Sequence, residues 1–207
     1  GDIDGDGWAD LFVGVFAYGE RTNMLFRNKN GKFEFDDQGV FRFPTRPTGM
    51  VFADLDNDGD LDLYFASMPL EVGKNKTLPD GTIGNSLFRN DGKGNFTNIS
   101  KSSGACPSDL GGRGVAIFDY DGDGLLDILA GSDPMPGYSG SETKSSRLFK
   151  NMGNLQFIDV TKEAGIPDNV PGYGVAACDI NNDGWPDFFI ACNDGGNRLF
   201  INDGKGR

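Results

Sequence analysis

The sequence predicts an all-β protein of the β-propeller class, and three features of its pattern indicate this. Its apolar runs are only four or five residues long and are bounded by Gly, Asn and Asp, as strands are. One Asp-rich segment recurs four times along the 207 residues. Four short strands surround the repeated segment, which is the content of one propeller blade. We therefore expect four-stranded antiparallel blades, about four in this chain, forming a partial propeller.

The repeated segment follows the pattern D-x-[DN]-x-D-G-x-x-D. Its copies begin at Asp2, Asp54, Asp119 and Asp179, at spacings of 52, 65 and 60 residues. A Gly and an apolar run precede each of the last three copies, and an apolar run follows all four. Two short strands joined by a tight loop make a β-hairpin, so each Asp loop is expected at a hairpin tip.

A second pair of strands completes each unit. The motif Leu-Phe-x-Asn leads into a Gly-containing turn in all four copies, and an aromatic strand follows the turn in the first three. The motif begins at Leu25, Leu87, Leu148 and Leu199, and the aromatic strands begin at Phe33, Phe96 and Phe157. One unit is therefore strand, Asp loop, strand, connection, strand, Gly turn, strand.

The first and last units are incomplete. The sequence opens inside the first Asp loop and stops before the closing strand of the fourth unit, so we expect 14 strands. The expected blades cover residues 1–38, 49–104, 112–165 and 172–207, and residues 1–207 form one partial propeller. We expect the chain to be a fragment of a longer propeller.

Each Asp loop offers the hard oxygen ligands that Ca²⁺ prefers, six to eight per ion. Positions 1, 3, 5 and 9 supply side-chain oxygens and position 7 a backbone carbonyl, while the Gly at position 6 permits a turn with positive φ. We therefore expect up to four Ca²⁺ ions. The expected ligands are, loop by loop, Asp2, Asp4, Asp6, Trp8 and Asp10; Asp54, Asp56, Asp58, Asp60 and Asp62; Asp119, Asp121, Asp123, Leu125 and Asp127; and Asp179, Asn181, Asp183, Trp185 and Asp187.

The charge distribution also favours a metal. Two carboxylates about 4 Å apart repel by about 4 kcal/mol at an effective dielectric constant of about 20. The expected side-chain ligands, at positions 1, 3, 5 and 9, include 15 of the 31 acidic residues, and the other 16 face 19 basic residues, so the net charge of −12 is concentrated in the loops. Polar β-turns rich in Asp and Gly are the alternative interpretation, but they do not require four copies in identical register.

Two related metal sites fit less well. An EF-hand needs a bidentate Glu at position 12 of its loop. Position 12 here is Val13, Phe65, Ala130 or Ile190, each in a strand pattern. Mg²⁺ prefers octahedral sites that retain water over cages made only of protein oxygens.

The Asp loop together with the Leu-Phe-x-Asn hairpin resembles the FG-GAP/VCBS repeat, the calcium-binding blade also found in integrin α-subunit propellers. The segments 157–165 and 174–184 are most similar to the cartilage acidic protein and ASPIC/UnbV branch of that family. The resemblance implies a parent propeller of seven or eight blades, an extracytoplasmic location and a binding role. Asn181 replaces an Asp at position 3, which implies a weaker fourth site, and the first loop lies at the chain end, which leaves its occupancy open.

Insertions concentrate in one kind of connection. The distance from the Phe of Leu-Phe to the next Asp loop is 28, 31 and 30 residues, whereas that from the last Asp of a loop to the next Leu-Phe is 15, 25, 21 and 12. The longer connections, residues 67–86 and 132–146, are expected on the face opposite the calcium loops. Variable loops on a rigid scaffold are a common place for binding, so a protein or glycan ligand is expected there, with tolerated surface variation as the alternative.

Together with these features, the family resemblance implies an extracellular, secreted, non-enzymatic module for binding or adhesion, with Ca²⁺ stabilising each blade. A sugar-binding lectin and part of a calcium-dependent polysaccharide lyase are the alternatives. Histidine is absent, which removes Ser-His-Asp and Cys-His catalysis, and no Lys/Tyr/Arg cluster marks a catalytic base. The acidic charge disfavours nucleic acid, and no apolar run approaches the length for membrane insertion. Three sequons, at Asn75, Asn95 and Asn98, are compatible with secretion.

The three cysteines, Cys106, Cys178 and Cys192, are too few for a disulfide framework. Cys178 ends an apolar strand pattern and is expected to be a small buried thiol. A disulfide between Cys106 and Cys192 is an open alternative.

Overall fold

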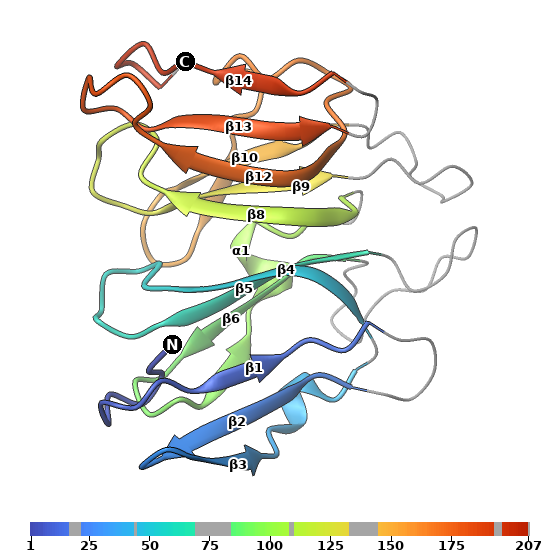
Figure 1. Cartoon of the computed structure of the whole chain (residues 1–207), viewed down its shortest axis with the longest axis vertical. Helices are drawn as coiled ribbons and strands as arrows, with labels where there is room; N and C mark the ends of the chain where they lie inside the picture. The colour runs from blue at the N-terminus through green and yellow to red at the C-terminus, as the bar shows by residue number, and fades with distance from the viewer. Residues whose placement is uncertain are drawn as a thin grey trace.

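The computed structural model describes residues 1–16, 22–43, 45–68, 84–107, 110–132, 145–192 and 196–206, and they form four separate antiparallel sheets (Figure 1). The first two sheets contain β1 (Leu11–Val13), β2 (Met24–Lys29) and β3 (Lys32–Asp36), then β4 (Arg46–Ala53), β5 (Asp62–Met68), β6 (Ser86–Asn90) and β7 (Phe96–Asn98). The last two contain β8 (Gly112–Phe118), β9 (Asp127–Ser132), β10 (Arg147–Asn151) and β11 (Phe157–Asp159), then β12 (Gly172–Cys178), β13 (Asp187–Cys192) and β14 (Arg198–Phe200).

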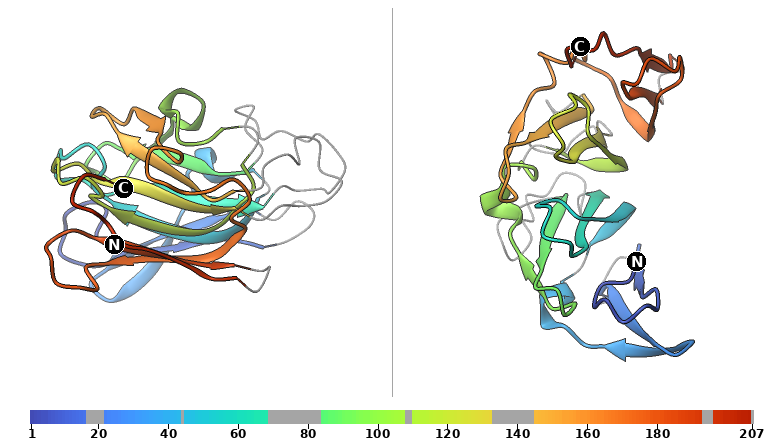
Figure 2. Two further views of the ribbon diagram at one scale, coloured as in Figure 1. Left: turned by 90° about the horizontal axis from the view of Figure 1, so that it is seen from above. Right: turned by 90° about the vertical axis from the view of Figure 1, so that its left-hand side faces the viewer.

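Strands pair in chain order within every sheet, so each sheet is an up-and-down meander. The sheets follow one another along an open arc from the N-terminus to the C-terminus (Figure 2). This arrangement confirms the predicted all-β fold of about four propeller blades, and the described residues contain the 14 strands expected. The only helices in the described part of the chain are η1 (Gly39–Phe41) and α1 (Ser100–Ser103), and none is long and apolar enough to cross a membrane.

The first strands of the last three sheets, β4, β8 and β12, lie side by side on the concave side of the arc (Figure 2). Glycine allows this close approach between β4 and β8. A Cβ atom added to Gly49 would lie 2.9 Å from the carbonyl oxygen of Arg113 and 3.2 Å from the nitrogen of Val115. The glycine that precedes each Asp-loop strand in the sequence thus marks where neighbouring inner strands meet.

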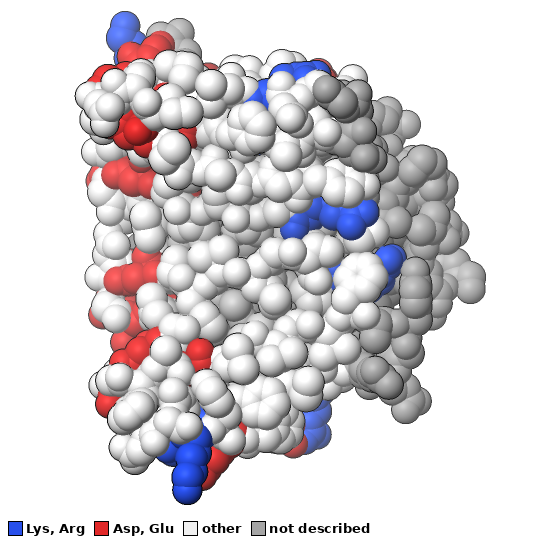
Figure 3. Space-filling model, in the orientation of Figure 1, with Lys and Arg blue, Asp and Glu red and all other residues white. Residues whose placement is uncertain are grey.

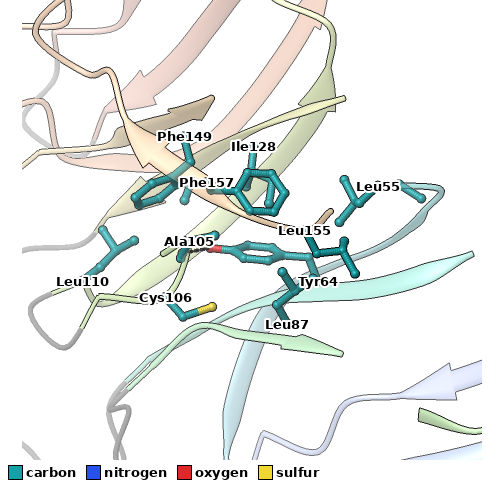
Figure 4. Packing of buried hydrophobic residues seen from close by; sticks show 12 residues of the cluster. Leu55, Tyr64, Leu87, Ala105, Cys106, Leu110, Ile128, Phe149, Leu155 and Phe157 are labelled. Carbon is teal, nitrogen blue, oxygen red and sulfur yellow. Dashed lines mark hydrogen bonds between the residues drawn. The ribbon is translucent and has the colours of Figure 1, made fainter. Parts of the chain in front are cut away.

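Three hydrophobic clusters fill the spaces between the four sheets. The middle cluster contains Tyr64, Leu87, Ile128 and Phe149, and Figure 4 shows the Tyr64 ring lying among them. Strands β5 and β9 are buried along their whole length because sheets cover both faces. This double burial explains why their sequences are continuous apolar runs without alternation.

Position 2 connects each of the first three Asp loops to a hydrophobic cluster between two sheets. Ile3, Leu55 and Tyr120 are buried in the cluster between their own sheet and the next one, and Leu55 is labelled in Figure 4. The corresponding Ile180 of the fourth loop is exposed, since no described sheet follows the fourth. The first three loops are therefore anchored under a neighbouring sheet.

The prediction of a buried Cys178 is wrong, because this residue is exposed. Cys178 ends β12, the inner strand of the fourth sheet, and one face of that sheet is uncovered in the described chain, as the exposed Leu199 and Ile201 also show. Cys106 is buried in the middle cluster and Cys192 is partly buried in the last one, so they form no disulfide with each other. Burial of a strand residue depends on the neighbouring sheet, which the local pattern does not reveal.

Candidate metal centre

All four Asp loops lie at the same edge of the stacked sheets. Three of them join β4 to β5, β8 to β9 and β12 to β13, and the first leads into β1. They occupy the left side of Figure 1, and Figure 3 shows acidic side chains gathered along that edge. The last three loops are therefore hairpin tips.

The aspartate at position 1 organises each loop. In the second loop the N–H of Asp58 donates to Oδ1 of Asp54 at 3.1 Å, and the N–H of Gly59 donates to Oδ2 at 3.0 Å. The same two bonds, from positions 5 and 6, occur in the other three loops. The backbone therefore curls around one carboxylate, as short polar side chains induce in turns.

Two positions in each loop have a positive φ. The Gly at position 6 has φ between +85° and +93°, which confirms the prediction for that position. Position 4 also has a positive φ, between +58° and +75°, and is not anticipated from the sequence. Its occupants are Gly5, Asn57, Gly122 and Asn182, the residue types that tolerate the left-handed conformation best. That restriction to Gly and Asn is the signal that could have identified it.

The aspartate at position 9 is buried and bonds two parts of its sheet together. Oδ2 of Asp127 accepts the N–H of Tyr120, at position 2, at 2.9 Å, and Oδ1 accepts the N–H of Asn151, on β10, at 2.7 Å. The corresponding bonds form at the other three position-9 residues. Because these bonds use one lone pair of each oxygen, the carboxylate retains others for a cation.

Burial raises the pKa of the Asp62 and Asp127 carboxyls to about 7, although the backbone N–H bonds oppose this shift. Burial and the neighbouring Asp58 carboxylate likewise raise the pKa of Asp56. A nearby positive charge favours the ionised form of a carboxyl. The folded loops thus hold carboxylates in an environment where a cation would stabilise them.

Three loops bring a trio of carboxylate oxygens within 4.8 Å of one another. The trios come from positions 1, 3 and 5 in the first two loops and from positions 1, 3 and 9 in the third. They are Asp2, Asp4 and Asp6; Asp54, Asp56 and Asp58; and Asp119, Asp121 and Asp127. Together they use every position for which a side-chain ligand is expected. The position-7 carbonyls of Trp8, Asp60, Leu125 and Trp185 stay predictions.

The surroundings of two carboxylate oxygens at position 3 indicate whether these loops suit a cation. Oδ1 of Asp56 and Oδ1 of Asp121 are buried and have no hydrogen-bond partner. A buried carboxylate oxygen without a partner is costly. A hard divalent ion within the trio would satisfy both atoms, so the donor set fits Ca²⁺.

Basic residues on the strand that carries Leu-Phe-x-Asn contact positions 3 and 5 of the second and third Asp loops and position 3 of the first. Arg89 on β6 lies 3.4 Å from Asp56 and 3.3 Å from Asp58, and Lys150 on β10 contacts Asp121 and Asp123. In the first sheet Arg27 lies 3.2 Å from the Asp4 carboxylate. These residues occupy the variable position of Leu-Phe-x-Asn, and the recurrence of Arg, Arg and Lys there is the sequence signal that could have identified them.

The fourth loop differs from the other three in its position-3 residue and in the strand residue that would contact it. Asn181 stands at position 3 and donates its Nδ2–H to Asp183 at 2.9 Å. Ile201 stands where the other sheets have Arg or Lys. The fourth loop therefore lacks one carboxylate and also the cation that accompanies it elsewhere.

Comparison with known sequences agrees with this geometry. A family model described as FG-GAP-like repeat matches residues 2–65, 77–130, 138–190 and 179–207. These matches cover most of the chain, and every one of them contains at least one Asp loop.

Curated relatives are similar over nearly the whole chain. Cartilage acidic protein 1 of Xenopus tropicalis is 28% identical over 216 residues, which are 97% of this chain and 31% of that protein. Its counterparts in Mus musculus and Homo sapiens are also 28% identical, each over 218 residues. The chain thus spans about a third of the length of these relatives.

Proposed function

Because the chain belongs to the FG-GAP-like repeat family and resembles its cartilage acidic protein branch, we propose that it is a calcium-binding, non-enzymatic module that acts outside the cell by binding a partner. Proteins with these repeats generally serve as interaction modules, and the relatives carry cartilage in their name. In this proposal the loops hold the metal and the sheets present the binding surface.

The residues that would hold calcium are those at positions 1, 3, 5 and 9 of each loop, with the carbonyl of position 7. In the third loop these are Asp119, Asp121, Asp123 and Asp127, with Leu125. When bound, calcium would supply the positive charge that a loop of four carboxylates lacks. The chain's own contribution is to place these oxygens in one small volume through the bonds to positions 1 and 9.

One observation carries this proposal: Oδ1 of Asp56 and Oδ1 of Asp121 are both buried without a hydrogen-bond partner, at the same position of two successive loops. If the loops were polar β-turns without a metal, nothing would explain why these two oxygens are buried without a hydrogen-bond partner. Polar atoms of ordinary turns point to water or accept backbone N–H groups.

The partner surface is proposed at the end of the sheets opposite the Asp loops. Met68 and Ser132, where β5 and β9 finish, lie at that end. The long connections expected to bind lie largely outside the described residues, at 69–83 and 133–144, as does Asn75 of the first sequon. Asn95 is exposed and Asn98 half-buried on the described surface. A protein partner is favoured by the family, and a glycan is the alternative outcome of a binding screen.

A thermal melt with and without a calcium chelator tests the calcium proposal. At a free calcium concentration 100 times Kd, one site adds about 2.7 kcal/mol to the free energy of unfolding. We expect chelation to lower Tm by many degrees and Asp123→Ala to reproduce part of that loss. Asp168→Ala, which removes the same charge at an exposed residue outside the loops, is the matched control. A Tm that does not respond to chelation would contradict the proposal.

A further inference from the structure

The four Asp loops are joined to one another by a chain of hydrogen bonds that crosses every sheet boundary. The Asn of each Leu-Phe-x-Asn motif makes the crossing. Asn151 Nδ2 donates to the carbonyl of Leu55, at position 2 of the preceding loop, at 2.7 Å. Asn90 makes the same bond to Ile3, and Asn202 to Tyr120, both at 2.8 Å.

The same asparagine holds the loop of its own sheet. The backbone N–H of Asn90 donates to Oδ1 of Asp62 at 2.9 Å, and Oδ2 of Asp62 accepts the N–H of Leu55 at 3.3 Å. The peptide chain then continues from the N–H of Leu55 to its carbonyl, which Asn151 binds. Each loop thus contributes one buried carboxylate and one peptide carbonyl to a repeating connection.

Followed around the arc, the connection is continuous from the first loop to the last. Its members are, in order, Asp10, Ile3, Asn90, Asp62, Leu55, Asn151, Asp127, Tyr120, Asn202, Asp187 and Ile180. The three bridging asparagines are buried, with exposed fractions of 2%, 0% and 8%. Buried hydrogen bonds polarise one another and hold their groups in a fixed geometry.

The asparagine side chain supplies two donors and one acceptor to this bridge. One amide hydrogen of Asn90 goes to Ile3 and the other to Leu61 of its own loop, while Oδ1 accepts the N–H groups of Gly92 and Gly94. Aspartate would lack both donors. Asn28 in the first sheet makes the same kind of bonds within its sheet, to Ala9, Gly31 and Asp10.

We propose that these asparagines couple neighbouring metal loops, so that a cation in one loop raises the affinity of the next. The inference rests on the proposed calcium function. An ion bound to the position-9 aspartate would hold the carboxylate that accepts the backbone N–H of the asparagine. The side chain of that asparagine in turn holds the position-2 carbonyl of the preceding loop. Thermodynamic linkage makes the coupling reciprocal, equal in both directions between the two loops.

Trp8 offers a reporter for the first loop. The chain has only two tryptophans, Trp8 and Trp185, both at position 7 of a loop. The probe is Tb³⁺, a calcium substitute whose emission is sensitised by a nearby indole, and Trp185→Phe removes the second donor. Titrating the whole chelated chain with Tb³⁺, with excitation at wavelengths that indole absorbs and the five tyrosines do not, then gives the affinity of the first loop. Asp58→Ala disables the second loop, and Asp58→Asn serves the same purpose with less change of shape.

We expect Asp58→Ala to weaken Tb³⁺ binding at the first loop about 2- to 10-fold, the range of one net hydrogen bond. In an Asn90→Ala background, disabling the second loop should change that affinity less than about twofold, because the bridge is already broken. Asn28→Ala is the matched control: it removes the side-chain bonds to Ala9 and Gly31 within the first sheet but no bridge, so the response to Asp58→Ala should remain.

An affinity of the first loop that is unchanged by disabling the second would overturn the coupling, as would an equal response with and without Asn90. Either result would leave the calcium proposal standing, since the first loop would still bind. Absence of sensitised emission from every variant, including the parent, would instead contradict the proposed metal function and with it the coupling.

Discussion

The Nζ atom of Lys150 lies 2.9 Å from Oδ2 of Asp123, so the third Asp loop has a cation of its own on the adjacent strand β10. The hydrogen bond with Asp121 and that with Asp123 raise the pKa of Lys150, which is therefore charged at neutral pH. Loops with four ligand carboxylates have such a partner, whereas the fourth loop, with three, has Ile201 in its place. The strand residue thus offsets one of the four negative charges of the loop.

Replacing Lys150 with Met should have opposite effects on stability and on affinity. Without the ammonium group the carboxylates of the third loop repel one another more strongly, so the chelated protein should melt at a lower temperature. Calcium binding should become tighter by several-fold, because a like charge near the ion has been removed. Melting curves and calorimetric titration measure the two effects. Lys162→Met, at an exposed lysine outside the loops, should change neither.

The fourth loop allows the reverse experiment. Asn181→Asp adds a fourth carboxylate beside Asp183 without a compensating cation. We expect the chelated protein to lose stability and the fourth loop to bind calcium more tightly. Adding Ile201→Lys should recover part of the lost stability, because it recreates the arrangement of the third loop. Equal melting temperatures for all three chelated proteins would contradict the charge-balance account.

Gly49 should be sensitive to the smallest possible side chain. An added Cβ would lie 2.9 Å from the carbonyl oxygen of Arg113, and this backbone on β8 has to move to make room. We expect Gly49→Ala to reduce the free energy of unfolding by about 1–3 kcal/mol. At Gly174 the nearest atom to an added Cβ is 3.9 Å away. Gly174→Ala should therefore be neutral or stabilise by up to about 1 kcal/mol in the same denaturant titration.

The hydroxyl group of Tyr64 is the polar contact in the middle cluster. It donates to the carbonyl of Ala105 at 3.0 Å (Figure 4) and accepts Nδ2–H of Asn85 at 2.8 Å. Tyr64→Phe leaves both partners buried and unsatisfied, which should cost about 1–3 kcal/mol. Urea unfolding measures this loss, and calcium affinity should stay unchanged because Tyr64 lies outside the loops. A loss of affinity would contradict this separation of core and loop.

The sequence predicted what depends on local spacing. The recurrence of Asp, Gly and Leu-Phe identified the hairpins, their order and the positive φ of Gly59 and its equivalents. It did not predict that Arg89 or Lys150 would contact a loop about 30 residues earlier, because partner choice depends on strand register. It misjudged Cys178, whose burial depends on an adjoining sheet.

Position 9 shows the same limit within the site. Asp62 and Asp127 were expected only as ligands, and their spacing gave no sign that both oxygens also accept backbone N–H groups. The donors are the backbone N–H of position 2 in the same loop and the backbone N–H of an asparagine more than 20 residues later in the sequence. The bridging role of Asn151 emerges only when two sheets are stacked.

The most direct test of the account is a crystal structure grown with calcium, using anomalous scattering to locate the ions. We expect an ion in the second and third loops, 2.3–2.6 Å from carboxylate oxygens that include Oδ1 of Asp56 and Oδ1 of Asp121. Well-ordered loops that hold no ion at millimolar calcium, with these two oxygens bonded to water or to protein donors, would contradict it.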